Sequence, residues 1–467
     1  MIAADFRNAR DVMRLGTAQP LLAALKTAKS LGARITARMG RVRRALRARR
    51  PMSRPRNLIH DTAYRRARAA AVRVVHGADD LVAELRGGRR RVLFEAASPV
   101  SFAVFRPVLA LLQGDPRIEF WFTTSDGAWA PEAVFGPVGI TERVIGAADA
   151  KWMKFDAYIN TDFWNMTWLP RRSRRVHLFH GVAGKYGLDA PTHIAPVVAT
   201  FDRLLFANRD RLRRYADAGL IDPDGEAAAL VGYPKVDCLV DGSLDRSGVL
   251  RRMGLDPAAP TVLYAPTWSP YSSLSQAGAS IITSLARRGG NVIVKLHDRS
   301  YDTSDRASGG VDWRLRLERV CREYDVHLAD GFDTSPYLVA ADVLVTDHSS
   351  VGFEYMLLDR PIVVIDCPQL LVHARVSQEK AALLRGAAEV VDAADVAAGV
   401  GRALADPWRQ ASRRRAIADA FFYDPGRASA RAADCIYDVL ALSHSHNAPS
   451  HAVAARPGLS SFETRTI

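Results

Sequence analysis

Short apolar runs alternate with helical segments from about residue 89 onward. Each run has the length of a strand and ends in turn residues, whereas 101–114 repeats apolar positions at helical spacing. Strands that alternate with helices predict a parallel sheet covered on both faces. The first series of predicted strands covers 91–97, 118–124, 156–162, 175–181, 203–208 and 229–234.

A second series follows the polar segment 241–260, whose Gly and Pro residues predict a link between domains. Its strands are predicted at 261–267, 291–297, 326–330, 342–347 and 361–366, and residues 409–440 are predicted to be helical. We therefore expect an α/β chain with two tandem Rossmann-like domains that face a cleft. The predicted parts are an arm (1–58), two domains (59–245 and 246–442, the second with closing helices) and a disordered tail (443–467).

Composition is that of a globular protein of several domains, with 467 residues, 48% hydrophobic and 24% charged. The four cysteines lie far apart without a CxxC pair, which argues against a zinc site or a disulfide framework and fits a reducing cytoplasm. No run of about 18 apolar residues predicts a transmembrane helix, and the N-terminus does not have the pattern of a secretory signal.

Charge is concentrated in the N-terminal arm. Residues 1–60 hold 15 Lys and Arg against two acids, whereas the other 407 residues hold 49 against 48. Such an arm could be a solvated tail, a nucleic-acid binder or a membrane-surface helix. Nucleic acid is disfavoured because no aromatic residues interleave with the arginines. Apolar residues from Leu21 to Met39 recur at helical intervals, which favours an interfacial helix on an anionic membrane, peripheral on its cytoplasmic face.

Ligands of such sheets bind at the carboxyl ends of the strands, and one predicted strand ends there in Thr346-Asp347-His348-Ser349-Ser350. Ser349 or Ser350 could only cap the following helix, or could join its free N–H groups in holding a phosphate. Glu354 lies one turn further on, where a carboxylate could reach ribose hydroxyls or could simply favour the helix dipole.

Three further strand ends carry polar groups. One ends at His180-Gly181, followed by a glycine-spaced loop with Lys185, and His180 is a candidate proton acceptor. Lys295 and His297 lie two residues apart on one face of another strand and suit a diphosphate. Thr267 and Trp268 end a third, where a base or phosphate could dock.

Known cofactor and hydrolase motifs are missing from the sequence. It has no GxxxxGK[ST], no GxGxxG after a strand, no GxSxG and no HExxH. Asp222-Pro223-Asp224 reads as a turn. We expect neither a metal nor a cofactor.

Five motifs, in this order, resemble those of the CDP-glycerol glycerophosphotransferases, the teichoic-acid primases and polymerases. The family's W/F-H-G-T-x-x-K-x-x-G, L-Y-A-P-T-W, K-x-H-P, T-D-Y-S-S-x-x-F-[DE] and D-G-[KR]-[AS] appear as "FHGVAGKYG", "LYAPTWS", "KLHD", "TDHSSVGFEY" and "DPGRASAR". The resemblance covers roughly residues 90–438. Three departures are Val182 for Thr, Asp298 for Pro and His348 for Tyr.

The resemblance implies a glycosyltransferase-B fold, with an acceptor domain followed by a donor-nucleotide domain. It implies that His180 is the base on an acceptor hydroxyl and that His297, Ser349 and Ser350 contact the donor phosphates. The implied reaction moves glycerol phosphate, or a related alditol phosphate, from a CDP-activated donor to a lipid-linked polyol or glycan and releases CMP. The predicted catalytic pair is His180 and His297, and the predicted substrate contacts are Gly181, Lys185, Thr267, Trp268, Lys295, Asp347, Ser349, Ser350 and Glu354.

Two other interpretations remain open from the sequence. A nucleotide-sugar glycosyltransferase or epimerase could share this fold, because fold alone does not decide function. The second is a membrane scaffold that keeps the fold but has lost catalytic activity. The presence of His180 and His297 at strand ends argues against it.

Overall fold

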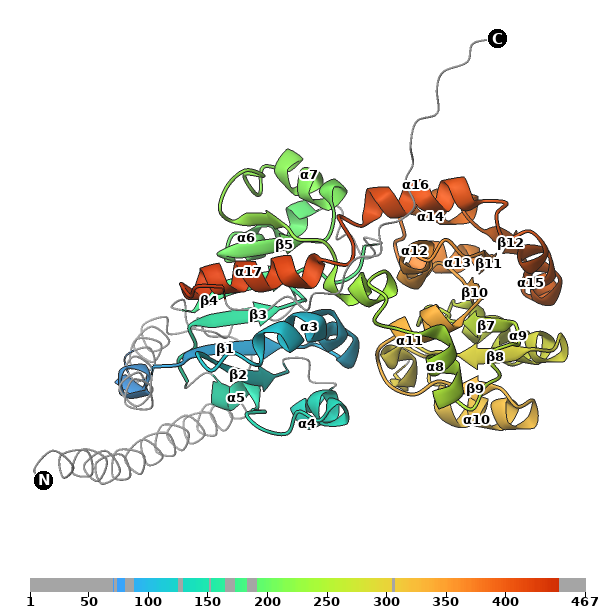
Figure 1. Cartoon of the computed structure of the whole chain (residues 1–467), viewed down its shortest axis with the longest axis horizontal. Helices are drawn as coiled ribbons and strands as arrows, with labels where there is room; N and C mark the ends of the chain where they lie inside the picture. The colour runs from blue at the N-terminus through green and yellow to red at the C-terminus, as the bar shows by residue number, and fades with distance from the viewer. Residues whose placement is uncertain are drawn as a thin grey trace, which may run out of the picture.

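The computed structural model describes residues 70, 74–79, 88–124, 129–150, 153–163, 173–182, 191–304 and 307–444. The predicted arm (1–58), Lys185 and the tail beyond residue 444 lie outside these residues. Within the described part, the chain forms two lobes that lie side by side, each built on a sheet (Figure 1).

The first sheet has six parallel strands in the order β2-β1-β3-β4-β5-β6. Its central strands are buried because helices cover them, and all four residues of β3 are buried. The strands are β1 (Arg90–Glu95), β2 (Ile118–Thr123), β3 (Ala157–Asn160), β4 (Arg174–Leu178), β5 (Arg203–Phe206) and β6 (Ala228–Leu230). The helices of this lobe include α3 (Pro99–Leu112), α4 (Pro131–Phe135), α5 (Ala147–Ala150), α6 (Ala195–Val198) and α7 (Arg209–Asp217).

The second sheet also has six parallel strands, in the order β12-β11-β10-β7-β8-β9. They are β7 (Thr261–Tyr264), β8 (Asn291–Val294), β9 (His327–Leu328), β10 (Val343–Thr346), β11 (Ile362–Ile365) and β12 (Glu389–Val391). Its helices are α8 (Arg246–Arg252), α9 (Ser273–Arg287), α10 (Trp313–Glu323), α11 (Ser335–Ala340), α12 (Ser350–Met356), α13 (Pro368–His373), α14 (Gln378–Gly386), α15 (Val396–Ala405) and α16 (Ala411–Phe421). The predicted fold class, two tandem Rossmann-like units, is confirmed.

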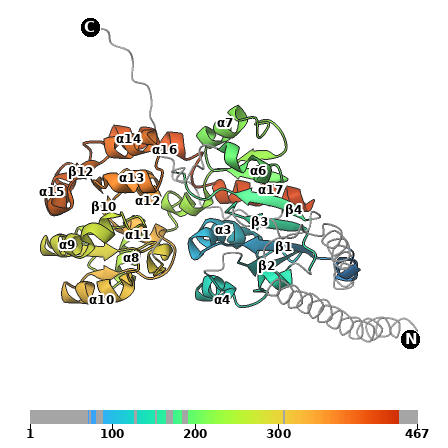
Figure 2. The same ribbon diagram turned by 180° about the vertical axis from the view of Figure 1, so that it is seen from behind.

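The chain crosses between the lobes twice. The first crossing is the 3₁₀ helix η5 (Pro234–Leu239), whose Val236 and Leu239 belong to a buried apolar cluster that reaches both sheets. The second leads from α16 to α17 (Ala428–Leu440), which packs against α3 of the first lobe. Figure 2 shows α17 lying along the first lobe from behind. The predicted C-terminal domain, 246–442, thus contains a helix that returns to the first sheet.

Two details of the second lobe differ from the sequence prediction. The segment 241–260, predicted as a polar link, contains α8, which packs against α11 through a side that includes the buried Val249 and Leu250. β12 was not predicted, because it is only three residues long and buries only Val391 fully. The other predicted strands are present.

In the described part of the chain, no helix is both long enough and apolar enough to cross a membrane.

Candidate functional site

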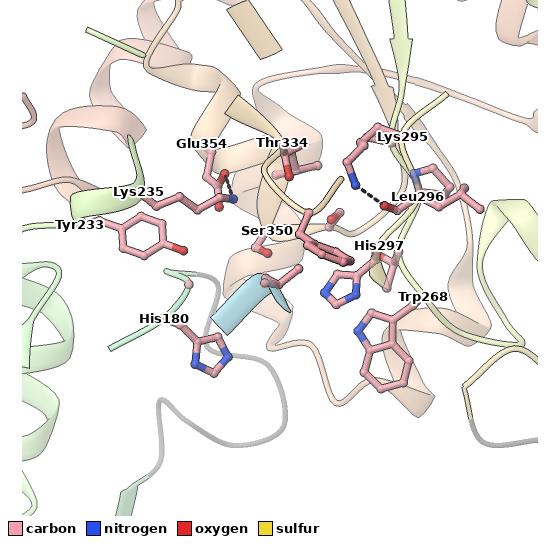
Figure 3. A pocket seen from close by; sticks show the side chains of 18 of the residues that line it. His180, Tyr233, Lys235, Trp268, Lys295, Leu296, His297, Thr334, Ser350 and Glu354 are labelled. Atoms are coloured by element: carbon pink, nitrogen blue, oxygen red, sulfur yellow. Dashed lines mark hydrogen bonds and ion pairs between the residues drawn. The ribbon is translucent and has the colours of Figure 1, made fainter. Parts of the chain in front are cut away.

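The candidate site is a cavity of about 180 Å³ between the two lobes, near the carboxyl ends of strands from both sheets. Figure 3 shows its labelled side chains converging from segments of both lobes. Most of the predicted site residues line it: His180, Gly181, Thr267, Trp268, Lys295, His297, Ser349, Ser350 and Glu354. Asp347 does not line it, and Lys185 lies outside the described residues.

His180 follows β4 and enters the cavity from the first lobe. Its Nδ1 lies 2.6 Å from the carbonyl oxygen of Thr161 and 3.5 Å from a carboxylate oxygen of Asp162. Both neighbours are acceptors, so Nδ1 carries the proton and Nε2 keeps its lone pair. With a proton on Nδ1, Nε2 is the nitrogen of His180 that could accept a proton in the neutral ring.

His177, three residues earlier, has a different environment. It is fully buried, stacks on Phe163 with ring centroids 3.8 Å apart, and lies 2.9 Å from the amide oxygen of Asn160. Burial holds the pKa of His177 well below its usual value. It is a neutral core residue.

His297 follows β8 and enters the cavity from the second lobe. Its Nδ1 lies 2.5 Å from a carboxylate oxygen of Asp298, which is fully buried. The backbone N–H of Arg299 also lies 3.2 Å from this Nδ1, but the much closer carboxylate fixes the proton on Nδ1. Asp298 is itself buried, which raises the pKa of a carboxyl group, but the attraction of His297 lowers it below the usual range.

Lys295 supplies a cation beside His297. Its side chain is buried and donates a hydrogen bond of 2.6 Å to the carbonyl oxygen of Leu296. Burial lowers the pKa of Lys295 to about 8, against the attraction of Asp298. The ammonium group is thus protonated at pH 7 but releases its proton more readily than an exposed lysine.

The serine turn keeps its hydroxyl groups toward the cavity. Ser349 is the N-cap of α12 by backbone conformation, yet its side chain makes no capping hydrogen bond. Asp347, behind this turn, accepts hydrogen bonds from the backbone N–H groups of Thr267 (2.9 Å) and Ser273 (3.1 Å). Asp347 thereby holds the loop that carries Thr267 against the serine turn.

Glu354 lines the cavity in an ion pair that joins the two lobes. Its carboxylate lies 2.7 Å from Nζ of Lys235 in η5, and the two side chains are 4% and 7% exposed. Burial would lower the pKa of Lys235, but the attraction of Glu354 raises it above the usual value. The carboxylate predicted to reach ribose is already engaged by a lysine.

The residues that line the cavity but were not predicted include Val100, Arg211, Tyr233, Lys235 and Thr334. Two of them belong to "VGYPKVD", which the sequence shows as a strand end in a Gly-Tyr-Pro turn. The rule that polar residues after a strand are site candidates applied to Lys235 as well as to Lys295. Arg211 gave no comparable signal, because it lies within α7 and reaches the site by donating a hydrogen bond of 2.8 Å to the carbonyl oxygen of Gly181.

Among the described residues, no group of three or more His, Cys, Asp or Glu side chains could hold a metal ion. The geometry instead provides an imidazole on one lobe, and an imidazole, an ammonium group and hydroxyl groups on the other. Such an arrangement can orient a phosphate ester and take a proton from an attacking hydroxyl group.

Comparison with known proteins agrees with this chemistry. Residues 148–369 match the family described as CDP-Glycerol:Poly(glycerophosphate) glycerophosphotransferase. No curated protein matches the sequence. The family resemblance predicted from the motifs, and with it the assignment to an enzyme family, is confirmed.

Solved structures of the wall teichoic acid polymerase TagF have the same fold. One matches with a TM-score of 0.58 at 14% identity and covers 82% of this chain and 96% of that chain. A TagF variant soaked with CDPG for 30 minutes matches with a TM-score of 0.56 at 14% identity, covering 83% and 99%. At this identity the likeness shows the fold, which is therefore that of the glycosyltransferase-B-like polymerases.

Proposed function

We propose that this chain, whose residues 148–369 belong to the CDP-glycerol:poly(glycerophosphate) glycerophosphotransferase family, transfers an alditol phosphate from a CDP-activated donor to a hydroxyl group of a lipid-linked acceptor. Glycerol phosphate is the donor group that the family name favours, and ribitol phosphate is the nearest alternative. The observation that carries the proposal is the pairing of His180 on one lobe with His297, Lys295 and the serine turn on the other.

The proposed reaction is a single displacement at phosphorus. Nε2 of His180 takes the proton of the acceptor hydroxyl group, and the oxygen of that hydroxyl group attacks the phosphorus next to glycerol. The phosphoanhydride bond breaks, and CMP leaves with the bonding electron pair. Lys295 and the hydroxyl groups of Ser349 and Ser350 stabilise the charge on the phosphates, and His297 does so when its Nε2 also carries a proton.

This assignment gives each lobe a role. The first lobe presents the acceptor hydroxyl to His180, and the second holds the donor nucleotide against Thr267, Trp268 and Glu354. We further propose that the basic arm, 1–58, holds the protein at the cytoplasmic face of an anionic membrane, where a lipid-linked acceptor would lie.

The experiment is a nucleotide-release assay with purified protein and membrane extract as the source of acceptor. CDP-glycerol, CDP-ribitol and a panel of UDP-sugars are compared, with His180→Ala as the catalytic control. Release of CMP from a CDP-alditol, lost in His180→Ala, supports the proposal and identifies the alditol. Release of UDP alone would overturn it in favour of a sugar transferase, and no release with no donor binding would favour a scaffold.

A further inference from the structure

Each of the two histidines across the cavity has a carboxylate beside its Nδ1. Asp162 lies 3.5 Å from Nδ1 of His180, and Asp298 lies 2.5 Å from Nδ1 of His297. Both carboxylates are shielded, with side-chain exposures of 15% and 0%. The carboxylates therefore lie behind the histidines and away from a bound substrate.

Both carboxylates also meet the first turn of one helix, α3. Ser101 donates a hydrogen bond of 2.9 Å from its hydroxyl group to Asp162. The backbone N–H of Val100, the neighbouring residue, donates one of 3.2 Å to Asp298, which belongs to the other lobe.

The N-cap residue Ser98 connects the two contacts. Its hydroxyl oxygen lies 3.3 Å from that of Ser101, and its side chain also hydrogen-bonds Asp298. In Figure 3 the start of α3, drawn in pale blue, lies between the labelled His180 and His297. The backbone N–H of Ser101 also donates a hydrogen bond of 3.4 Å to the hydroxyl oxygen of Ser98, so the first turn of α3 links the carboxylates that lie beside the two histidines.

We propose that Asp162 and Asp298 are positioning residues, and that the first turn of α3 acts through them to fix His180 and His297 in register across the cleft. The inference rests on the proposed function for the roles of the two histidines. The inference adds the contacts, made by the two carboxylates and the first turn of α3, that set the tautomers of the two histidines and the distance between them. Asp298, where the family pattern has proline, makes the contact between lobes that a proline could not make.

Distance and burial favour this role over a purely structural one. A carboxylate 2.5 Å from Nδ1 orients the ring and leaves Nε2 for the donor. A misplacement of about 1 Å between reacting groups can cost about 100-fold in rate. Other charged groups near the two histidines include Lys295, whose pKa responds to Asp298, and Arg211, which influences the neighbouring His177.

The first test is Asp298→Asn, which keeps an acceptor for Val100 but removes the charge beside His297. We expect kcat for CMP release to fall by about 10- to 100-fold, with KM for the donor within about threefold of wild type. Asp342→Asn is the matched control, because Asp342 also accepts a backbone N–H (Thr261, 2.8 Å) and pairs with an arginine, Arg246. An unchanged kcat in Asp298→Asn, or a rise in KM alone, would overturn the proposal.

The second test acts on the helix turn and leaves both carboxylates in place. Ser101→Ala removes the donor to Asp162, and Ser101→Thr keeps a hydroxyl group. We expect Ser101→Ala to lower kcat and Ser101→Thr to restore most of it, with equal melting temperatures. The control is Ser377→Ala at the N-cap of α14, which also loses a hydroxyl group that makes a hydrogen bond, here one accepted from the backbone N–H of Lys380. Equal activity of Ser101→Ala and wild type would contradict a role for this turn.

A third measurement needs no turnover and separates this inference from the proposed function. Nitrogen-15 NMR of the histidine rings reports the tautomer, with His297 assigned by the loss of its signal in His297→Gln. We expect His297 to carry its proton on Nδ1 in wild type and to shift toward Nε2 in Asp298→Asn. If no donor releases CMP but the tautomer shifts, the proposed function fails and the positioning role stands. An unchanged tautomer with active wild type would refute the positioning role alone.

Discussion

The buried ion pair between Lys235 and Glu354 gives a quantitative prediction for the stability of the protein. Nζ and the carboxylate oxygen are 2.7 Å apart, and the side chains are 7% and 4% exposed. Glu354→Gln keeps the shape of the side chain but leaves the ammonium group buried without its counter-charge. Removal of one partner of such a pair typically costs about 3–5 kcal/mol.

The protein can limit this cost by releasing the proton of Lys235. Neutralising a lysine at pH 7 costs about 1.4 kcal/mol for each pH unit below a pKa of about 10.4, and therefore about 5 kcal/mol. Both arguments place the loss of unfolding free energy for Glu354→Gln between about 3 and 5 kcal/mol. The double variant Lys235→Met/Glu354→Gln buries no unpaired charge, and we expect it to recover most of the loss.

Urea unfolding at pH 7 measures these free energies. Glu379→Gln is the control, because Glu379 pairs with Arg214 at 3.0 Å but is 61% exposed. An exposed pair contributes about 0–1 kcal/mol. If Glu354→Gln costs no more than Glu379→Gln, or if the double variant is the least stable of the three, the reasoning about the buried pair is wrong.

Three further predictions concern the site and the arm. His180→Ala should abolish transfer yet keep donor affinity in a calorimetric titration; a large loss of affinity would assign His180 to donor binding instead. Because the pKa of Lys295 is lowered to about 8, its charge is present below pH 8 and lost above it, so donor affinity should fall as pH rises through 8. Lys295→Arg, which stays charged, should lose this dependence, and a pH profile equal to that of wild type would refute the assignment. Deletion of residues 1–58 should release the protein from anionic liposomes and leave donor binding intact; unchanged liposome binding would exclude the arm as the anchor.

The sequence predicted the sheets well because most of their strands are buried. Val343–Thr346, for example, is fully buried and begins with three apolar residues before a polar turn, and this pattern does not depend on distant contacts. β12 lacked that signal because it is only three residues long and begins with the charged Glu389. The link at 241–260 was misread because a helix with only two buried residues resembles a polar connection.

The candidate site was predictable where residues follow a strand directly. His180, Lys295, His297 and the serine turn all met that rule and all line the cavity. Arg211 could not be found in this way, because it reaches the site from within a helix through its contact with Gly181. Contacts between side chains could not be predicted either, since no spacing in the sequence indicates that Glu354 contacts Lys235.

Asp298 illustrates the same limit. The sequence marked it only as a departure from the proline of the family pattern. Its contacts with His297 and with Val100, 198 residues away in sequence, depend on how the two lobes meet.

The two crossings between the lobes are tied together, and this has a consequence for motion. Asp237 in η5 accepts hydrogen bonds from the backbone N–H groups of Gly426 (2.8 Å) and Ser429 (2.7 Å) at the start of α17. Because the two connections are held side by side, the lobes can rotate relative to each other about a single hinge axis. Because Asp298 and Val100 belong to opposite lobes, an opening of the cleft would separate them, and the carboxylate beside His297 would then lose its contact with the first lobe.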